Sequence, residues 1–284
     1  MRKFLTVLLM LISFSLFGGD AEEVLLQFRP TPRPLSYLAA FHLQETDLMN
    51  IAMETGESKI LQREKKHYME IRKDLTRRGS QTDIPFTETA VQASLLDNTA
   101  KIHILKNESG EGRTAKPRTM VTSQFINGRL VQPFDLADLS AAGLPLLFSD
   151  QKVKQGSLWE RPIDFKRENL PPLAFNTKYE VVAFQHLAGH PVAVVTYTFK
   201  AALQSTLISQ DPLIQQKVAE LKRENVESVA YKGEGRFTFD YREGLLLTHS
   251  LTMSEKISKS YIEGRQRKLQ DIVRIYEYSE ALIP

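Results

Sequence analysis

The chain has 284 residues, of which 42% are hydrophobic and 25% are charged, a composition typical of a folded globular protein. Its formal net charge of +3 is too small for the concentrated basic surface that nucleic-acid binding usually requires, so we expect no nucleic-acid partner. The chain contains no cysteine, which excludes disulfides, thiol catalysis, thiolate metal sites and the lipid-modified cysteine of bacterial lipoproteins.

The first residues have the layout of a secretory signal peptide. Arg2 and Lys3 precede an apolar run over residues 4–17, and small residues follow it up to Ala21. The run is shorter than the ~20 residues that a membrane-spanning helix needs. We therefore predict a signal peptide over residues 1–21, cleaved after Ala21, with no transmembrane span in the mature chain. An uncleaved N-terminal anchor is the alternative.

This leader predicts an extracytoplasmic location, either periplasmic or secreted. An exported protein of this size without disulfides fits a bacterial envelope better than an animal secretory pathway. Removal of the leader leaves enough chain for one large domain or two modest ones. We expect two antiparallel β halves, at residues 22–143 and 144–284.

The N-terminal half opens with the clearest strand. Leu35, Tyr37, Ala39, Phe41 and Leu43 alternate with mostly polar residues, which is typical of a half-buried strand. After the polar residues 45–47 the alternation resumes over residues 49–53. We therefore expect a hairpin at residues 45–47.

Residues 57–78 fit two structures. Leu61, Tyr68, Ile71 and Leu75 have helical spacing, whereas Met69, Ile71 and Leu75 also fit one face of a long solvated strand. The strand is favoured because its surroundings are β. A concentration of basic side chains is interrupted by acidic ones and is interpreted as a solvated face rather than an anion site: Lys65, Lys66, His67, Arg72 and Lys73.

Further strands are expected at residues 90–95, 101–105 and 120–126, with a short helix near 135–143. Asn127-Gly128 between apolar pairs is a strong signal for a two-residue hairpin, because both turn positions need a positive φ.

The C-terminal half continues the β pattern. A hairpin is expected at residues 187–190, followed by a central strand at 192–199 that is apolar on both faces. The best helix lies near residues 211–224, with Asp211 as N-cap and Pro212 at the first position. Gly233 and Gly235 are interpreted as a bulge or bend in the sheet. A last strand is expected at 268–278.

No pattern in the sequence carries recognisable chemistry. His186 and His190 have the spacing of a metal pair, but the residues between them predict a turn. Nucleophile elbows, phosphate-binding glycine loops and calcium loops are absent from the sequence. Trp159 is interpreted as a core residue that follows a turn at Gly156. We therefore predict no catalytic residue, no metal ligand and no cofactor, and assign no ligand-binding residue.

Short motifs in residues 144–255 carry a resemblance. They include Leu144-Pro145, then Val153, Gly156 and Trp159 as a V-x-x-G-x-x-W turn, and the strand around residues 235–240 before Gly244. This segment resembles uncharacterised exported bacterial β-rich proteins. More distantly, its rhythm of strands and hairpins is similar to the lipoprotein carriers of the outer-membrane sorting pathway. That second resemblance implies a curved sheet that shelters acyl chains.

The fold class expected from these observations is mainly β, a β-rich α+β chain. We expect a curved antiparallel sheet or sheets, half-barrel or sandwich-like, with one or two short helices. The function expected is that of a non-enzymatic binding or scaffold module of the envelope. Its partner would be a hydrophobic ligand such as a lipid, or an envelope protein. The alternative is an envelope hydrolase whose carboxylates are brought together by the fold.

Overall fold

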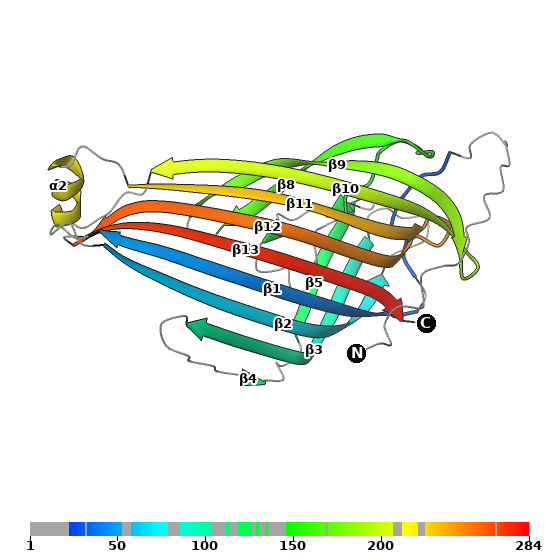
Figure 1. The fold of residues 1–284 in the computed structure, drawn as a ribbon. Coiled ribbons are helices and arrows are strands. Elements are labelled where there is room, and N and C mark those ends of the chain that lie inside the picture. The colour runs from blue at the N-terminus through cyan, green and yellow to red at the C-terminus, as the bar shows by residue number, and fades with distance from the viewer. Residues whose placement is uncertain are drawn as a thin grey trace, which may run out of the picture.

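The computed structural model describes residues 23–31, 33–52, 58–78, 86–103, 112–113, 119–126, 129–130, 134–135, 146–167, 170–206, 212–220, 225–264 and 266–283. Within these residues the chain forms a single curved sheet, and the expected mainly β class with a curved antiparallel sheet is confirmed (Figure 1). The one helix among them is α2 (Pro212–Glu220), at the position where Asp211 and Pro212 predicted it.

The sheet has 13 strands in the order β6-β5-β3-β2-β1-β13-β12-β11-β10-β9-β8-β7, and β4 pairs with β3. Neighbours are antiparallel except β7 and β8. The strands are β1 (Leu35–Ala52), β2 (Ser58–Arg78), β3 (Phe86–His103), β4 (Gly112–Arg113), β5 (Thr119–Ile126), β6 (Arg129–Leu130), β7 (Phe134–Asp135), β8 (Leu158–Arg167), β9 (Leu170–Leu187), β10 (His190–Thr206), β11 (Val226–Asp240), β12 (Leu245–Glu263) and β13 (Gln266–Ile283).

The first and last long strands lie side by side in the middle of the sheet. β1 pairs with β13 over residues 36–52 and with β2 over residues 35–52. Strands from both expected halves therefore belong to one sheet, while the boundary at residues 143 and 144 stays a prediction. The pairing of β5 with β6 agrees with a tight connection, although residues 127 and 128 themselves lie outside the described residues, as do residues 136–143 of the expected short helix.

The hairpin expected at residues 45–47 is wrong. β1 continues through these residues without a break in its pairing to either neighbour. Glu45 and Asp47 stay in the strand because their carboxylates bind Arg274 and Gln270 of β13, at 2.5 and 2.9 Å. The charged residues mark a polar part of the sheet face rather than a turn.

Residues 58–78 form β2, so the strand alternative is correct and the helix alternative is wrong. The hairpin at residues 187–190 is confirmed. Ala188 and Gly189 occupy the turn with φ of 50° and 87°, between the end of β9 and the start of β10. Residues 192–195 of β10 are fully buried, so coverage on both faces is confirmed for this part of the expected central strand at 192–199, whereas Thr198 is exposed.

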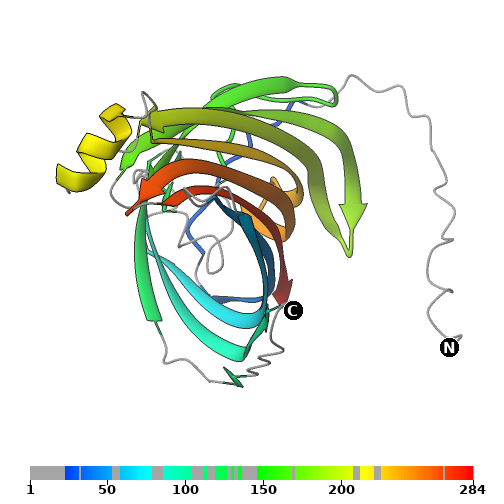
Figure 2. The ribbon, with the colours of Figure 1, turned by 60° about the vertical axis from the view of Figure 1, so that its left-hand side comes forward.

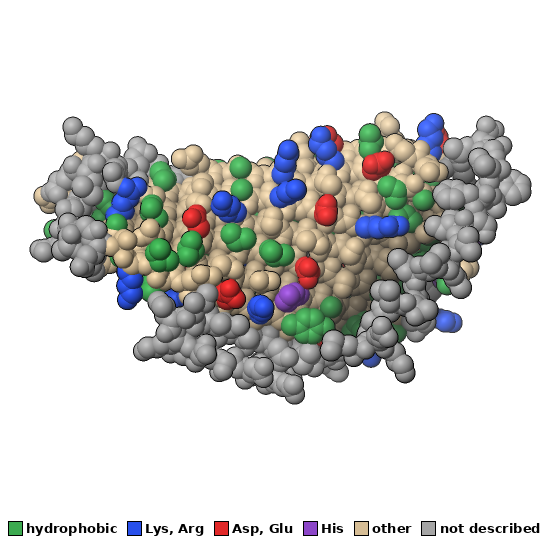
Figure 3. All heavy atoms as spheres, viewed as in Figure 1, with side chains coloured by type: hydrophobic (Ala, Val, Ile, Leu, Met, Phe, Trp, Pro, Cys, Tyr) green, Lys and Arg blue, Asp and Glu red, His purple; other side chains and the backbone are tan. Residues whose placement is uncertain are grey.

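The sheet curls around one face, and Figure 2 shows this curvature along the strands. We call the enclosed side the inner face; it carries the odd-numbered residues of β1, including the buried Tyr37, Ala39 and Phe41. The opposite side is the outer face. On β12 it carries Ser or Thr at six positions: Thr248, Ser250, Thr252, Ser254, Ser258 and Ser260. Charged side chains of both signs are interspersed over this face (Figure 3).

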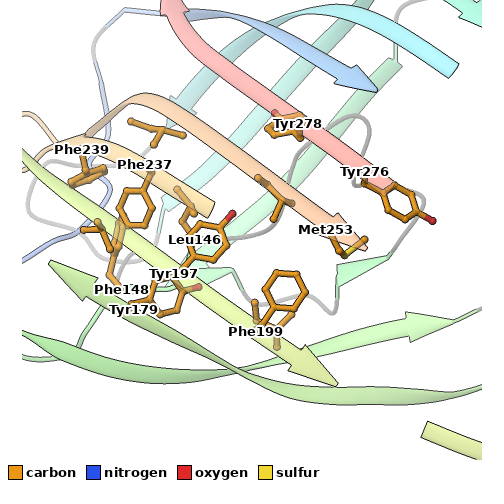
Figure 4. Packing of buried hydrophobic residues seen from close by; sticks show 14 of the residues in the cluster. Leu146, Phe148, Tyr179, Tyr197, Phe199, Phe237, Phe239, Met253, Tyr276 and Tyr278 are labelled. Atoms are coloured by element: carbon orange, nitrogen blue, oxygen red, sulfur yellow. The ribbon is translucent and has the colours of Figure 1, made fainter. Parts of the chain in front are cut away.

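Two segments, residues 23–31 and 146–153, cover one end of the inner face. Val24 and Val153 form an antiparallel bridge that joins them, with N–H···O distances of 2.9 and 2.7 Å. Phe148 packs against Phe28, Phe237 and Phe239, with ring centroids 5.0, 5.9 and 4.7 Å away (Figure 4). Aromatic pairs at such distances contribute about 0.5–1.5 kcal/mol each beyond the area they bury.

The interpretation of Gly233 and Gly235 as a bulge is wrong. Both lie in continuous register within β11, opposite Phe199 and Tyr197 of β10. Their missing side chains leave room for these two rings, because a Cβ on either glycine would come within 2.3 Å of a ring carbon. The register shift between β11 and β12 occurs later, at Thr238 and Phe239.

Candidate functional site

A row of polar side chains divides the inner face into two halves. Five residues face each other in register across five neighbouring strands, and we call them the charged row: Lys65, Glu45, Arg274, Glu255 and Tyr231. On one side lies the closed half, where aromatic side chains are buried beneath residues 23–31 and 146–153. On the other side lies the open half, toward the end of the sheet at which α2 is found (Figure 1).

The charged row is held together by charge-assisted hydrogen bonds. Arg274 donates to Glu45 at 2.5 Å and to Glu255 at 3.0 Å. Glu255 also accepts bonds from the hydroxyls of Tyr231 and Tyr276, at 2.7 and 2.8 Å. Glu255 is only 2% exposed, and each of its oxygens is bonded, as a buried carboxylate requires.

These contacts also shift two pKa values. Burial would lower the pKa of Arg274, but the bond to Glu45 and the charge of Glu255 outweigh it and raise that pKa. The pKa of Tyr276 is raised first by burial and then by the charge of Glu255. Arg274 therefore stays a cation and Tyr276 a neutral donor at every physiological pH.

Beyond the charged row the inner face carries both apolar and charged side chains. The next row across the strands is apolar on β10 to β13, with Leu203, Val229, Ile257 and Ile272, and charged on β1 and β2, with Asp47 and Arg63. The row after it is apolar on β1 and β2, with Met49 and Leu61, and polar on β11 to β13, with Glu227, Lys259 and Gln270. Leu203, Met49 and Leu61 are only partly buried, unlike the aromatic residues of the closed half. The open half therefore offers apolar surface beside charged groups.

A second polar cluster lies inside the closed half. Lys73 donates to Tyr278 and, at 2.6 Å, to Glu280. His249 lies 3.4 Å from Glu280 through Nδ1 and 2.7 Å from the Tyr197 hydroxyl through Nε2. Because a carboxylate only accepts, His249 donates to Glu280 through Nδ1. We call these five residues the buried network.

The buried network keeps Glu280 ionised. Burial alone would raise the pKa of Glu280, but the charge of Lys73 and the bond from His249 outweigh it and lower that pKa to about 2. Burial is the largest cause that raises the pKa values of Tyr197 and Tyr278, so both phenols stay neutral. The network is closed to solvent, since Lys73, Glu280 and His249 side chains are 5%, 8% and 1% exposed.

The structure separates the basic residues that the sequence grouped at 65–73. Lys66 and Arg72 lie on the outer face, while Lys65 joins the charged row and Lys73 the buried network. Lys73 is only 4% exposed, so the interpretation of this group as a solvated face is wrong for it. The alternation of β2 places Lys65 and Lys73 inside, where Lys65 lies in register opposite Glu45 and Lys73 donates to Glu280.

Trp159 is a packing residue, as interpreted from the sequence. Its ring stacks on Tyr179 at 5.1 Å with an interplanar angle of 5°, and its Nε1 donates to the Leu147 carbonyl at 2.9 Å. Gly156, with φ of 80°, makes the turn before β8.

His186 and His190 flank the tip of the β9–β10 hairpin. The hydrogen-bond partner of His190 is Asp240, at 2.7 Å. Among the described residues, no three metal-ligating side chains gather around one point. In these same parts of the chain, no helix has both the length and the apolar character needed to cross a membrane.

The comparisons with known proteins do not assign the chain to a family. No protein-family model matches it, and no curated protein does either. Among solved structures, the crystal structure of an outer membrane channel from Pseudomonas putida F1 is similar at a TM-score of 0.25 and 10% sequence identity. The match covers 90% of this chain and 98% of that one, but at this TM-score it supports no inference about function.

Proposed function

We propose that the protein is a non-enzymatic binding module of the bacterial envelope that holds an apolar or amphipathic molecule, such as a lipid, against the open half of its inner face. The observation that carries this proposal is the partial exposure of Leu203, Met49 and Leu61 on the inner face beyond the charged row. The envelope location is supported by the basic, then apolar, then small-residue pattern of residues 1–21.

The energetics favour a ligand with an apolar part. Covering apolar surface contributes roughly 25 cal/mol per Å² removed from water. The outer face of β12 offers little such surface, because Ser and Thr dominate it, whereas the outer faces of β1, β2 and β13 expose apolar side chains such as Leu48, Ile60 and Ile275. The open half combines apolar side chains, such as Val229, Ile257 and Leu203, with the charged row beside them, which suits a molecule with both an apolar chain and a polar end.

The hydrolase alternative is not supported by the carboxylates that converge on the inner face. Glu45 and Glu255 both accept bonds from Arg274, and both oxygens of Glu255 are bonded to this chain's own side chains. A glycosidase places its two carboxylates on either side of a substrate bond instead. The guanidinium group of Arg274 already occupies the position between Glu45 and Glu255.

Fluorescence of N-phenyl-1-naphthylamine, which brightens in apolar surroundings, tests the proposal. We expect the probe to bind the purified chain and dodecanoate to displace it. Met49→Lys places a charge on the inner face and should weaken probe binding about tenfold or more. Leu48→Lys is the matched control, because Leu48 is the adjacent residue of β1, lies on the outer face and is 41% exposed.

Equal binding by both variants would contradict an inner-face site. No probe binding by the wild-type chain would contradict the lipid-binding proposal altogether and leave the scaffold role.

A further inference from the structure

The outer face carries a shallow hollow that the proposed function does not use. It has a volume of about 360 Å³ and lies over β1, β13 and β12, with β2 at its side. Small-molecule sites begin at about 300 Å³, so the hollow has the size for a single small ring or two. Its outward-facing lining is Ala40, His42, Tyr68, Ser250, Thr252, Glu277 and Ser279.

The register of the strands explains why the surface is hollowed here. Ala40, Ser279 and Ser250 face each other across β1, β13 and β12, and their short side chains form the floor. The adjacent row contains the longer side chains of Tyr68, His42 and Glu277, which form a wall along it. The floor is therefore a product of three short residues in register.

The wall combines an aromatic ring, an imidazole and a carboxylate. His42 Nδ1 lies 3.2 Å from Glu277 Oε2, and the two side chains are 40% and 59% exposed. Tyr68 is 36% exposed, and its hydroxyl donates to Glu70 at 2.8 Å, which fixes the ring along β2. The bond to Glu70 is the largest cause that raises the pKa of Tyr68, so the ring stays neutral.

We propose that this hollow is a binding site for a pyranose sugar, in which one face of the sugar ring lies against Tyr68 and its hydroxyls bond to Glu277, His42 and the floor serines. A sugar presents both C–H groups, which suit an aromatic ring, and hydroxyls that donate and accept. The carboxylate of Glu277 supplies acceptors, and the hydroxyls of Ser250 and Ser279 supply donors and acceptors.

Other ligand classes fit the hollow less well. Its outward-facing lining contains no Leu, Ile, Val or Met side chain, so it offers no wall for an acyl chain. It holds one carboxylate, which already has His42 as a partner, so a small cation would meet few oxygen ligands. This site is on the opposite side of the sheet from the open half, and its test is independent of lipid binding.

Saturation-transfer difference NMR on the full chain tests the proposal. The probes are cellobiose, maltose and N,N′-diacetylchitobiose at millimolar concentration, with choline as a cationic probe. We expect transfer to the ring protons of at least one disaccharide. Transfer to choline alone, or to no probe, would overturn the proposal.

Variants assign the signal to the hollow. Tyr68→Ala should weaken sugar binding about tenfold, whereas Tyr68→Phe keeps the ring and should stay within about twofold of wild type. Glu277→Gln should also weaken binding. Glu180→Gln is the control, because Glu180 is an exposed residue of β9, far from the hollow in strand order. Unchanged binding by Tyr68→Ala, with the far-UV circular dichroism of the wild type, would overturn the site.

Discussion

The ring of Tyr197 lies directly over Gly235 of the neighbouring strand. A Cβ on Gly235 would be 2.2 Å from the Cζ atom and 2.3 Å from the hydroxyl oxygen of Tyr197. With no side chain in the way, Tyr197 reaches across β11 and its hydroxyl bonds to His249 of β12 at 2.7 Å. Gly235 therefore permits one bond of the buried network.

Gly235→Ala should destabilise the protein by about 1–3 kcal/mol, because the added methyl forces the Tyr197 ring out of its place. It also approaches the Ser250 carbonyl, at 2.6 Å. Urea unfolding measures the change. Glu234→Ala is the control, since Glu234 is the preceding residue and points outward. An equal loss of unfolding free energy in the two variants would contradict the close packing of Tyr197 against Gly235.

The analogous pair of Phe199 and Gly233 allows a double-mutant cycle. The three atoms nearest a Cβ on Gly233 all belong to the Phe199 ring, the closest at 2.3 Å. Gly233→Ala should cost about 1–3 kcal/mol alone, and less in a chain that already carries Phe199→Leu. Additive losses would show that the ring is not what the new methyl meets.

Glu280 should make stability depend on pH in the acid range. Its pKa is about 2 in the folded protein and 4.5 as the ordinary value, so the folded state holds its proton less tightly. The stabilisation is complete above about pH 4.5 and is lost as the pH falls through about 2, and its size is on the order of 3 kcal/mol. Urea unfolding between pH 7 and pH 2 measures it.

Glu280→Gln should be less stable than wild type at pH 7 and should converge with it as the pH falls below 4.5. Glu234→Gln, which changes an exposed carboxylate on the outer face, should keep the wild-type pH dependence. If Glu280→Gln kept the full acid dependence of the wild type, the Lys73–Glu280 pair would not be its source.

Arg274→Met should be strongly destabilising, since it leaves Glu255 buried without a cation. Breaking a buried ion pair typically costs about 3–5 kcal/mol, and the lower end applies because the Arg274 side chain is 28% exposed. Lys268→Met is the matched control on the same strand and face. Its partner Glu263 is 59% exposed, so the loss should stay below about 1 kcal/mol. Similar losses of stability for Arg274→Met and Lys268→Met in thermal unfolding would contradict a buried charged row.

The sequence predicts the elements better than it predicts their length. Alternation over Leu35 to Leu43 identifies β1, and the segment 187–190 between two apolar strands identifies the β9–β10 hairpin. The end of β1 is misjudged because Glu45 and Asp47 interrupt the apolar pattern without interrupting the strand. The sequence pattern alone does not distinguish a polar residue within a strand from a polar residue in a turn, because it does not show the hydrogen-bond partner.

Those partners lie far away in the chain. Glu45 meets Arg274, and Lys73 meets Glu280, only because β1 lies between β2 and β13 in a particular register. Registers between distant strands are set by the whole inner face, so neither the charged row nor the buried network has a local signal. The spacing of Gly233 and Gly235 is visible in the sequence, but the rings above them are not.

The most direct test of the account is to map where a lipid touches the chain. A photoactivatable analogue of dodecanoate is irradiated with the purified protein, and the labelled residues are identified by mass spectrometry. We expect labels on the inner-face residues of the open half, such as Met49, Leu61 and Leu203. Labels confined to outer-face residues such as Leu48 and Ile60, or no label that excess dodecanoate suppresses, would contradict a binding face inside the curved sheet.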